Sequence, residues 1–550
     1  MIKRRRRPLY SKINEKLEIP RLFRGYSLIA IFEDLEQEKG FRVKTKLREQ
    51  LDARKRKIQR RLDKTKFPKK PGPVLAGGNL RYEIADRVHG LSYGGISLFH
   101  QLARDIGLIK AIDTRLPILK IRLPYSESDH VVNIAFNALC NGDCLQDLEL
   151  RRNDVNYLDA LGAQRIPDPT TAGDFCRRFT APHLDLLQDI LDDVRVGVWQ
   201  HQPACFFHEA ILDADGTLVA TTGQCKRGMD IAYNGVWGYH VLVVSLANTR
   251  EVLRIVNRPG NRPSHEGAAD ALDTAAASCL RGGFRRVRLR GDTDFSQTEH
   301  LDRWNADGRI SFVFGYDSRL NLVEMAEHLP ERAWQKLQRP PKYQAVTGLR
   351  HRPENVKDKI VRERGFETLR LQSEEVAEFN YRPHACQQDY RMIVVRKNIS
   401  KEKGEFLLQD EIRYLFYITN DWTSDAHEIV FSANDRCHQE NLLQQLKSGM
   451  HALTAPVDNL QSNWAYMVMT SVAWSLKAWA ALRLPETGRW AKKYRAEKQW
   501  LLGLEFKAFV NAFVAIPCQI VRQARRLVCR VLSYHQYLPI FFRLAEVLHC

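Results

Sequence analysis

The chain has 550 residues, which is too long for one ordinary hydrophobic core and predicts two to four domains. Its composition, 44% hydrophobic and 27% charged, is typical of a folded soluble protein. The charge is unusual, because 84 Lys+Arg stand against 65 Asp+Glu and give a formal net charge of +19. A basic excess of this size favours a polyanionic partner, of which nucleic acid is the foremost candidate.

Neither the cysteines nor the apolar runs indicate a secreted or membrane protein. Eleven cysteines are scattered singly, and 140–144 holds the one close pair, which excludes a zinc framework. The longest apolar run, 464–482, contains Lys477 and several hydroxyl groups, so it predicts a core helix rather than a membrane span. No secretory signal is expected. We therefore expect reduced thiols, a cytoplasmic location and no membrane partner.

The basic excess is concentrated at the N-terminus. Residues 1–70 hold 24 Lys+Arg and 9 Asp+Glu, a net of +15. Because phosphate neutralisation favours clustered cations, we predict that a basic arm and helix over 1–75 contact DNA, with a linker at 66–73. A solvated tail and an anionic membrane surface are the alternatives. The cations expected to contact DNA are Arg4, Arg5, Arg6, Lys55 and Arg56.

Residues 76–205 predict an all-α region that serves DNA binding or dimerisation. Within it, PDPTTAGDF (167–175) places a proline directly after a capping aspartate, which is typical of a helix start. The same stretch is compatible with a helix-turn-helix and with a helix packed inside an all-α domain.

A strand-like pattern over 206–318 predicts the element order β-β-β-α-β-α-β. The expected strands are 210–220, 238–247, 251–258, 285–292 and 310–316, and the expected helices are 264–280 and 296–307. This is the order of an α/β ribonuclease-H-like (retroviral-integrase-like) core, in which the first strand is central and the fourth runs beside it. A basic loop at 223–228 follows the first strand and fits either a DNA contact or an ordinary turn.

The remainder of the chain predicts an interruption of this core and its completion. Residues 319–413 predict a β-rich insertion, and 414–485 predict the second part of the core, with an amphipathic helix over 436–449. Residues 486–550 predict a C-terminal helical region. The expected fold class is therefore a ribonuclease-H-like core with a β-rich insertion, flanked by all-α N-terminal and C-terminal regions.

Carboxylates occur where this fold would bring them together. Asp213 and Asp215 lie two residues apart on the first strand and so share a face, Asp292 ends the fourth strand, and Glu440 lies within the later helix. Such carboxylates repel one another unless a cation lies between them. Oxygen ligands suit Mg²⁺, for which Mn²⁺ can substitute. Two such ions would activate water or a 3′-hydroxyl and stabilise the leaving oxygen of a phosphodiester.

Several short motifs, taken in order, resemble those of bacterial insertion-sequence transposases of the group-1 DDE type, which carry a β-rich insertion in the catalytic core. The motifs are LDADGT (212–217), GQ (223–224), RPGN (258–261), RLRGDTDF (288–295) and RCHQENLLQQLK (436–447). The resemblance covers roughly residues 95–490.

The resemblance assigns three acids as catalytic residues and metal ligands. Asp215 resembles the first because it directly precedes GT, with Asp213 as the second candidate for that place. Asp292 resembles the second acid and Glu440 the third. The separations are 77 residues from Asp215 to Asp292 and 148 residues from Asp292 to Glu440.

Two basic residues on the glutamate helix also match the family. Arg436 lies four residues before Glu440 and Lys447 seven residues after it, so the three share a helix face. The resemblance implies that both cations contact DNA. A tyrosine that the family carries seven residues before the glutamate is replaced by Ala433, which leaves its phosphate contact without a counterpart.

The function that the resemblance implies is cut-and-paste transposition of an insertion sequence. The enzyme would hydrolyse DNA at the transposon ends, and the freed 3′-hydroxyl would attack the opposite strand or target DNA. Its partners would be double-stranded DNA, as terminal inverted repeats and target, and a second copy of itself in the DNA complex. The location would be the bacterial cytoplasm, at the nucleoid. The alternatives are a structure-specific nuclease of the same fold and a non-catalytic DNA-binding relic.

Overall fold

The computed structural model describes residues 45–60, 88–339, 356–403, 406–523 and 526–549. The chain divides into two compact units, 1–85 and 86–550. In the first unit a helix spans 45–60, and its Lys55 and Arg56 side chains are exposed. The other predicted DNA contacts, Arg4, Arg5 and Arg6, lie outside the described residues, as does the predicted linker.

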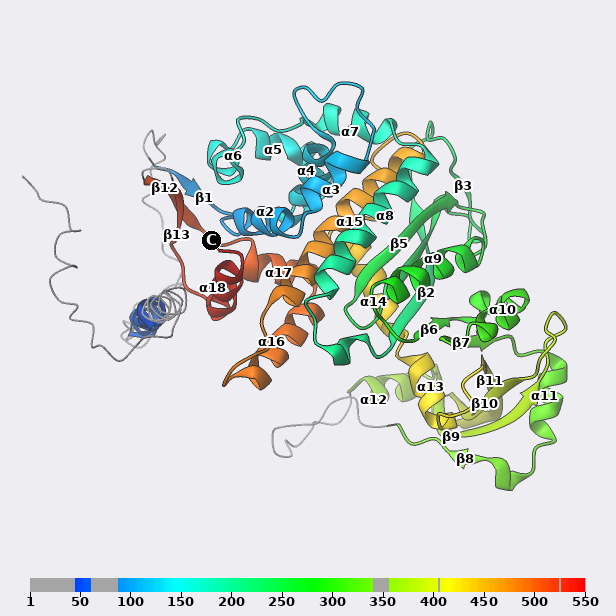
Figure 1. The fold of residues 1–550 in the computed structure, drawn as a ribbon. Coiled ribbons are helices and arrows are strands. Elements are labelled where there is room, and N and C mark those ends of the chain that lie inside the picture. The colour runs from blue at the N-terminus through cyan, green and yellow to red at the C-terminus, as the bar shows by residue number, and fades with distance from the viewer. Residues whose placement is uncertain (1–44, 61–87, 340–355, 404–405, 524–525, 550) are drawn as a thin grey trace, which may run out of the picture. The chain divides into compact units, whose positions relative to one another are not determined.

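The second unit begins with a short strand and a group of helices (Figure 1). The predicted helix start near 168 is confirmed, because the Asp168 side chain accepts a hydrogen bond from the Thr171 backbone N–H at 2.9 Å and Pro169 is the first helical residue. These elements are β1 (Gly90–Leu91), α2 (Ile96–Asp105), α3 (Leu108–Arg115), α4 (Glu127–Leu139), α5 (Leu148–Arg152), α6 (Val155–Leu161), α7 (Pro169–Arg177) and α8 (Ala181–Trp199).

The predicted strands and their order are present in a large mixed sheet. Its first part runs in the spatial order β5-β4-β2-β6-β7, with β2 parallel to β6 and antiparallel to β4. The first strand is therefore central and the fourth lies beside it, as predicted. The elements are β2 (Ala210–Ala220), β3 (Asp230–Ile231), β4 (Trp237–Leu246), β5 (Glu251–Pro259), α9 (Ala268–Arg281), β6 (Val287–Gly291), α10 (Leu301–Ala306) and β7 (Ile310–Tyr316).

Both faces of this sheet are covered. All of β4 except Trp237 is buried, as expected for a central strand with helices on either side. Helix α9 packs against β2, β4, β5 and β6, and α14 (Cys437–Gln444) packs against β2. The helix predicted over 296–307 is shorter than expected: two 3₁₀ turns precede α10. Asp292 starts the first of these turns by accepting from the Asp294 backbone N–H, so the chain tightens before it becomes α-helical.

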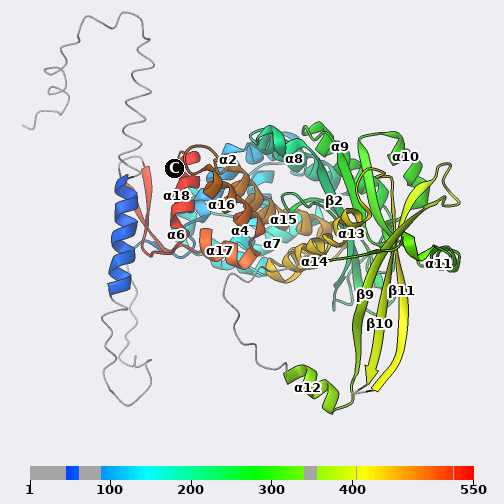
Figure 2. The same ribbon diagram turned by 90° about the horizontal axis from the view of Figure 1, so that it is seen from below.

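The segment after β7 does not form a separate sheet. Its three long strands continue the core sheet in the order β7-β11-β10-β9-β8, and β11 pairs with β7 from Phe416 to Thr419. The boundary that the sequence predicts between the β-rich insertion (319–413) and the second part of the core (414–485) therefore falls inside β11 (Phe406–Thr419). Figure 2 shows the three strands extending together toward α12. The other elements are α11 (Leu320–Glu327), β8 (Gln335–Lys336), α12 (Val356–Glu363), β9 (Glu367–Tyr381), β10 (Tyr390–Lys403) and α13 (Ala426–Asn434).

The predicted core helix is confirmed as α15 (Leu460–Arg483), which is buried from Ser462 to Leu482. The prediction of an all-α C-terminal region is wrong. Strands β12 (Cys518–Gln523) and β13 (Arg526–Val531) form a hairpin, and β12 pairs with β1, so the two ends of the second unit share a three-stranded sheet. In β12 the alternating residues Cys518 and Ile520 are buried, as suits a strand with one covered face. The remaining helices are α16 (Ala491–Gly503), α17 (Phe506–Phe513) and α18 (Leu538–Val547).

The Glu251 carboxylate, at the start of β5, joins the sheet to two helices. It is fully buried and accepts four hydrogen bonds: from Thr249, from Arg195 and Trp199 of α8, and from Trp479 of α15. Arg195 also pairs with the buried Asp192. A buried charge is tolerated only when it is satisfied in this way. The network therefore fixes how α8 and α15 lie against the edge of the sheet.

Within the described ranges, no helix has both the length and the apolarity needed to cross a membrane. Every cysteine in those ranges is a free thiol.

We predict that Glu251→Ala lowers the free energy of unfolding by about 3–5 kcal/mol, because it leaves the Arg195 Nε–H and two indole N–H groups buried without their acceptor. Urea denaturation measures this loss. Glu266→Ala, at a side chain that is 44% exposed and pairs only loosely with Arg262, should change the free energy of unfolding by less than about 0.5 kcal/mol. Equal effects of the two substitutions would contradict the role given to Glu251.

Candidate active site

The pairing register of β2 and β6 places two acids side by side. In this parallel pair, Ala210 lies opposite Val287 and Asp213 lies opposite Arg290, so residues 77 apart in sequence are neighbours. Two residues further along the same register, Asp215 comes next to Asp292, which directly follows the end of β6. Asp215 and Asp292 are 77 residues apart in sequence because paired residues of β2 and β6 differ by 77 in number.

Asp213 shares a face of β2 with Asp215 but has a different environment. Its carboxylate accepts two hydrogen bonds from the Arg290 guanidinium, at 2.7 and 2.9 Å, and both residues are buried. Arg290 also donates to the Ser432 carbonyl at the end of α13. Asp213 thus has its charge balanced inside the protein and holds α13 over the sheet, which favours Asp215 as the first acid of the site.

Arg436 lies between the two neighbouring acids. Its Nη1 atom is 3.5 Å from Asp215 Oδ2 and 3.9 Å from Asp292 Oδ2. The Asp215 side chain is 15% exposed and the Asp292 side chain 37% exposed, so both can be reached from solvent. A guanidinium at this position balances part of the negative charge that two adjacent carboxylates create.

The acids nevertheless hold their protons more tightly than ordinary carboxyl groups. Burial raises the pKa of Asp215 to about 6, and the charges of Asp292 and Glu440 add to this rise while Arg436 opposes it. Burial also raises the pKa of Asp292, again against the effect of Arg436. Partly desolvated acids with a raised pKa are typical of functional sites.

Glu440 reaches this edge of the sheet through the docking of α14. The preceding residue, Gln439, is buried and donates to the Val243 carbonyl at 3.1 Å, while the Ser245 hydroxyl donates to its side chain. Glu440 itself is exposed and acts electrostatically on Asp215. The sequence predicts that the carboxylates of Asp215, Asp292 and Glu440 meet closely enough to share a metal ion. In the described ranges, no three His, Cys, Asp or Glu side chains approach that closely. Arg436 supplies the positive charge between the two aspartates instead.

Lys447 lies in a π-helical turn, 445–449, that follows α14. Burial lowers the pKa of its ammonium group, and the negative charge of Asp215 opposes this. The predicted helix over 436–449 is thus an α-helix from Cys437 that widens in its last turn. Arg436 is the N-cap residue of this helix. Arg436, Glu440 and Lys447 all act electrostatically on Asp215 of β2.

Sequence reasoning missed His240, which lies beside the first acid on the opposite face of the sheet. Its Nδ1–H donates to the Arg262 carbonyl at 2.6 Å. A Cβ added to Gly216 would come within 2.8 Å of His240 Nε2, so any side chain directly after Asp215 would have to displace the imidazole. A glycine inside a strand is the sequence signal for such a close approach. The charges of Asp294 and Lys447 also act on His240.

The basic loop at 223–228 makes structural contacts with residues 455–459. The Lys226 ammonium donates to the Ala455 and Val457 carbonyls, and Arg227 bridges to Asn459. These bonds tie the end of β2 to the segment that joins α14 to α15. The ordinary-turn interpretation of this loop therefore holds for Lys226.

The chain is similar to known proteins in both sequence and structure. It belongs to the transposase DDE domain group 1 family, whose model matches residues 88–549. Membership implies DNA as a partner and a divalent metal as a cofactor. A comparison with curated proteins finds no match. Among solved structures, the chain is similar to a piggyBac transposase in its synaptic complex with hairpin DNA, with 11% identity and a TM-score of 0.32 over 76% of this chain and 81% of that chain.

We predict a pH-dependent effect of Asp215→Asn on the stability of the metal-free protein. Because the folded-state pKa of about 6 exceeds the ordinary 3.8, ionisation above pH 6 penalises the folded state by on the order of 3 kcal/mol. The variant should therefore be more stable than the wild type at pH 8, and the difference should vanish as the pH falls from 6 to below 4. Urea denaturation at several pH values measures it. Asp317→Asn, at an exposed position between β7 and α11, is the control, and an Asp215→Asn difference that does not change with pH would contradict the assignment.

A second prediction concerns the contact between Gly216 and His240. Gly216→Ala should lower the free energy of unfolding by about 1–3 kcal/mol, because the new methyl group overlaps the imidazole. Adding His240→Ala should recover part of that loss. Full stability of Gly216→Ala alone, measured by urea denaturation, would contradict the close packing.

Proposed function

We propose that the protein is a cut-and-paste DNA transposase of an insertion sequence, with Asp215, Asp292 and Glu440 as its catalytic acids. The observation that carries this proposal is the pairing of Asp215 and Asp292 across neighbouring strands, with Arg436 between them and Glu440 within electrostatic reach. Family membership supports the reaction class.

The side chains at this edge suit a hard divalent cation. Asp215, Asp292 and Glu440 offer carboxylate oxygens, which are the ligands that Mg²⁺ and Mn²⁺ prefer. The raised pKa values of the two aspartates indicate that additional positive charge beside them would favour their ionised forms. We propose Mg²⁺ as the cofactor, as two ions, with Mn²⁺ able to substitute. When bound, such ions polarise a phosphodiester and stabilise the leaving oxygen.

The chain's own residues have separate tasks in this reaction. The acids ionise and hold positive charge, while Arg436 and Lys447 lie where they can contact the phosphate that is attacked. In the first step water attacks phosphorus at the transposon end, and the bond to the 3′ oxygen breaks, which frees a 3′-hydroxyl. In the second step that hydroxyl attacks another phosphodiester, on the opposite strand or in target DNA, and displaces its 3′ oxygen. Each step exchanges one P–O bond for another.

The partners that we propose are duplex DNA, carrying terminal inverted repeats, and target DNA. Lys55 and Arg56 are exposed on the helix at 45–60 and contribute phosphate contacts in this proposal. A homodimer in the DNA complex would bring two ends together. We propose a bacterial cytoplasmic location at the nucleoid for such an enzyme.

A non-catalytic DNA-binding relic is the second candidate. It is favoured by one observation: the described side chains include no group of three acids arranged to hold a metal ion. A relic would bind the terminal repeat and leave it intact.

We predict metal-dependent nicking of a labelled duplex that carries the terminal repeat flanking the gene. With Mg²⁺ or Mn²⁺ the wild type should nick at the transposon end, and Asp292→Asn should lower the rate by at least about 100-fold because it removes a metal ligand. Asp317→Asn should nick as the wild type does. Binding without nicking by the wild type, with either metal, would contradict a catalytic role and favour the relic.

A further inference from the structure

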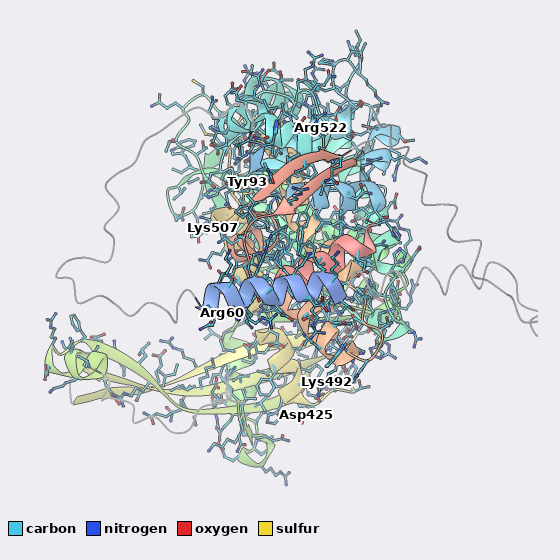
Figure 3. The ribbon with its side chains drawn as sticks, turned by 90° about the vertical axis from the view of Figure 1, so that its left-hand side faces the viewer. Arg60, Tyr93, Asp425, Lys492, Lys507 and Arg522 are labelled. Atoms are coloured by element: carbon cyan, nitrogen blue, oxygen red, sulfur yellow. The ribbon has the colours of Figure 1, made fainter. Side chains whose placement is uncertain are left out.

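A basic surface lies at the start of α16 and on the two residues that directly precede this helix. It consists of five exposed side chains within seven residues, and we call it the α16 surface: Arg489, Trp490, Lys492, Lys493 and Arg495. Figure 3 labels Lys492 on this helix. Four cations and no acid occur in this stretch, so the local charge is strongly positive.

The acids nearest to this surface are turned inward. Glu486 is 17% exposed and accepts from the buried Lys498 at 2.6 Å and from Arg495 at 3.2 Å. Glu497 is 19% exposed and pairs with Arg543 and, at 3.7 Å, with Lys493. By contrast, the Lys493 and Arg495 side chains are 65% and 68% exposed. Solvated helices usually present both signs of charge outward, whereas the outer face here presents one.

Two of the cations have no acidic partner within the described part of the chain. Lys492 makes no ion pair there, and Arg489 contacts the Trp490 ring, with its guanidinium carbon 5.5 Å from the ring centre. Trp490 is itself 53% exposed. A guanidinium against an exposed indole keeps its hydrogen-bond donors available to a ligand.

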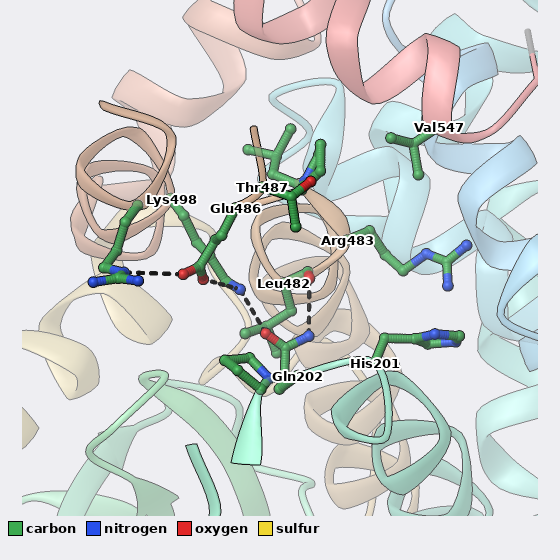
Figure 4. Close-up of a pocket in the computed structure, with 12 residues that line it drawn as sticks. His201, Gln202, Leu482, Arg483, Glu486, Thr487, Lys498 and Val547 are labelled. Atoms are coloured by element: carbon green, nitrogen blue, oxygen red, sulfur yellow. Dashed lines mark hydrogen bonds and ion pairs between the residues drawn. The ribbon is translucent and has the colours of Figure 1, made fainter. Parts of the chain in front are cut away.

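The surface rests on a fixed base. Lys498 donates to Gln202, whose side-chain amide donates to the Leu482 carbonyl, and this chain of bonds joins α16 to α15 (Figure 4). Tyr494 lies beneath the Arg543 guanidinium at 4.0 Å. A cavity of about 610 Å³, lined by Arg495 and Thr487 among others, borders the same base. The backbone that carries these cations is therefore held in place, and a fixed spacing of cations suits a ligand with regularly spaced negative charge.

We propose that the α16 surface binds the phosphate backbone of duplex DNA, as a contact separate from the acids. Clustered outward cations of one sign fit a polyanion, and phosphate contacts position DNA without reading its sequence. This inference rests on the proposed function, since it concerns the same DNA. It assigns α16 the task of holding a stretch of the duplex outside the site of cleavage.

The test uses the full-length protein and a fluorescent duplex carrying the terminal repeat, without metal. In fluorescence anisotropy, Arg489→Ala/Lys492→Ala/Lys493→Ala should weaken binding by at least about 10-fold, and the salt dependence of log Kd should lose about 2–3 in slope, at roughly 0.9 per phosphate contact. A duplex of unrelated sequence should lose affinity by the same factor.

The matched control removes three exposed cations outside every segment to which a DNA contact is assigned, as Arg285→Ala/Arg286→Ala/Lys336→Ala. It should bind more tightly than the α16 variant, and both should unfold at the wild-type urea concentration. Wild-type affinity of the α16 variant, or an equal loss in the control, would overturn the inference. Because nicking by the wild type is measured separately, that failure would leave the proposed function standing, whereas a wild type that neither binds nor nicks would overturn both.

Discussion

The guanidinium of Arg436 between the carboxylates of Asp215 and Asp292 is the contact on which the candidate site depends. Burial raises the pKa of Asp215 to about 6, and repulsion from the adjacent Asp292 carboxylate adds to that rise. The arginine relieves part of this repulsion from a helix that also carries Glu440. The position of α14, which carries Glu440, is therefore coupled to the ionisation of Asp215 and Asp292. A cation bound between the acids would change the environment of Arg436.

The surrounding structure holds this arrangement by satisfying buried polar groups. Arg290 binds Asp213 and the end of α13, and Gln439 binds the backbone of β4, so the segment carrying Arg436 and Glu440 is anchored on both sides. Lys226 closes the loop beyond β2 against the segment after α14. At the far edge, Glu251 fixes α8 and α15 against β5. Each of these contacts joins segments that are distant in sequence, and so the site depends on the whole second unit.

Much of the core could be predicted because its signals are local or periodic. The alternation of β2 and β6 and the cap at Asp168 lie within short stretches, and the 77-residue spacing of two acids turned out to be a strand register. Contacts between distant residues could not be predicted. The sequence around Asp213 does not indicate that Arg290 is its partner. Likewise, the contact between His240 and Gly216 is visible only in the folded structure. The strands β12 and β13 were missed because their apolar residues also fit helices, and their pairing with β1 joins opposite ends of the unit.

The central claim is that these three acids join DNA strands and do not merely cut them. It is tested most directly by offering the full-length protein a pre-cut transposon end with a free 3′-hydroxyl, a supercoiled plasmid and Mn²⁺, and measuring covalent end–plasmid product. Our account predicts joined product with the wild type and none with Asp215→Asn, Asp292→Asn or Glu440→Gln. Hydrolysis of the end without joining would indicate a nuclease of the same fold, and joining by all three variants would contradict the assignment of the site.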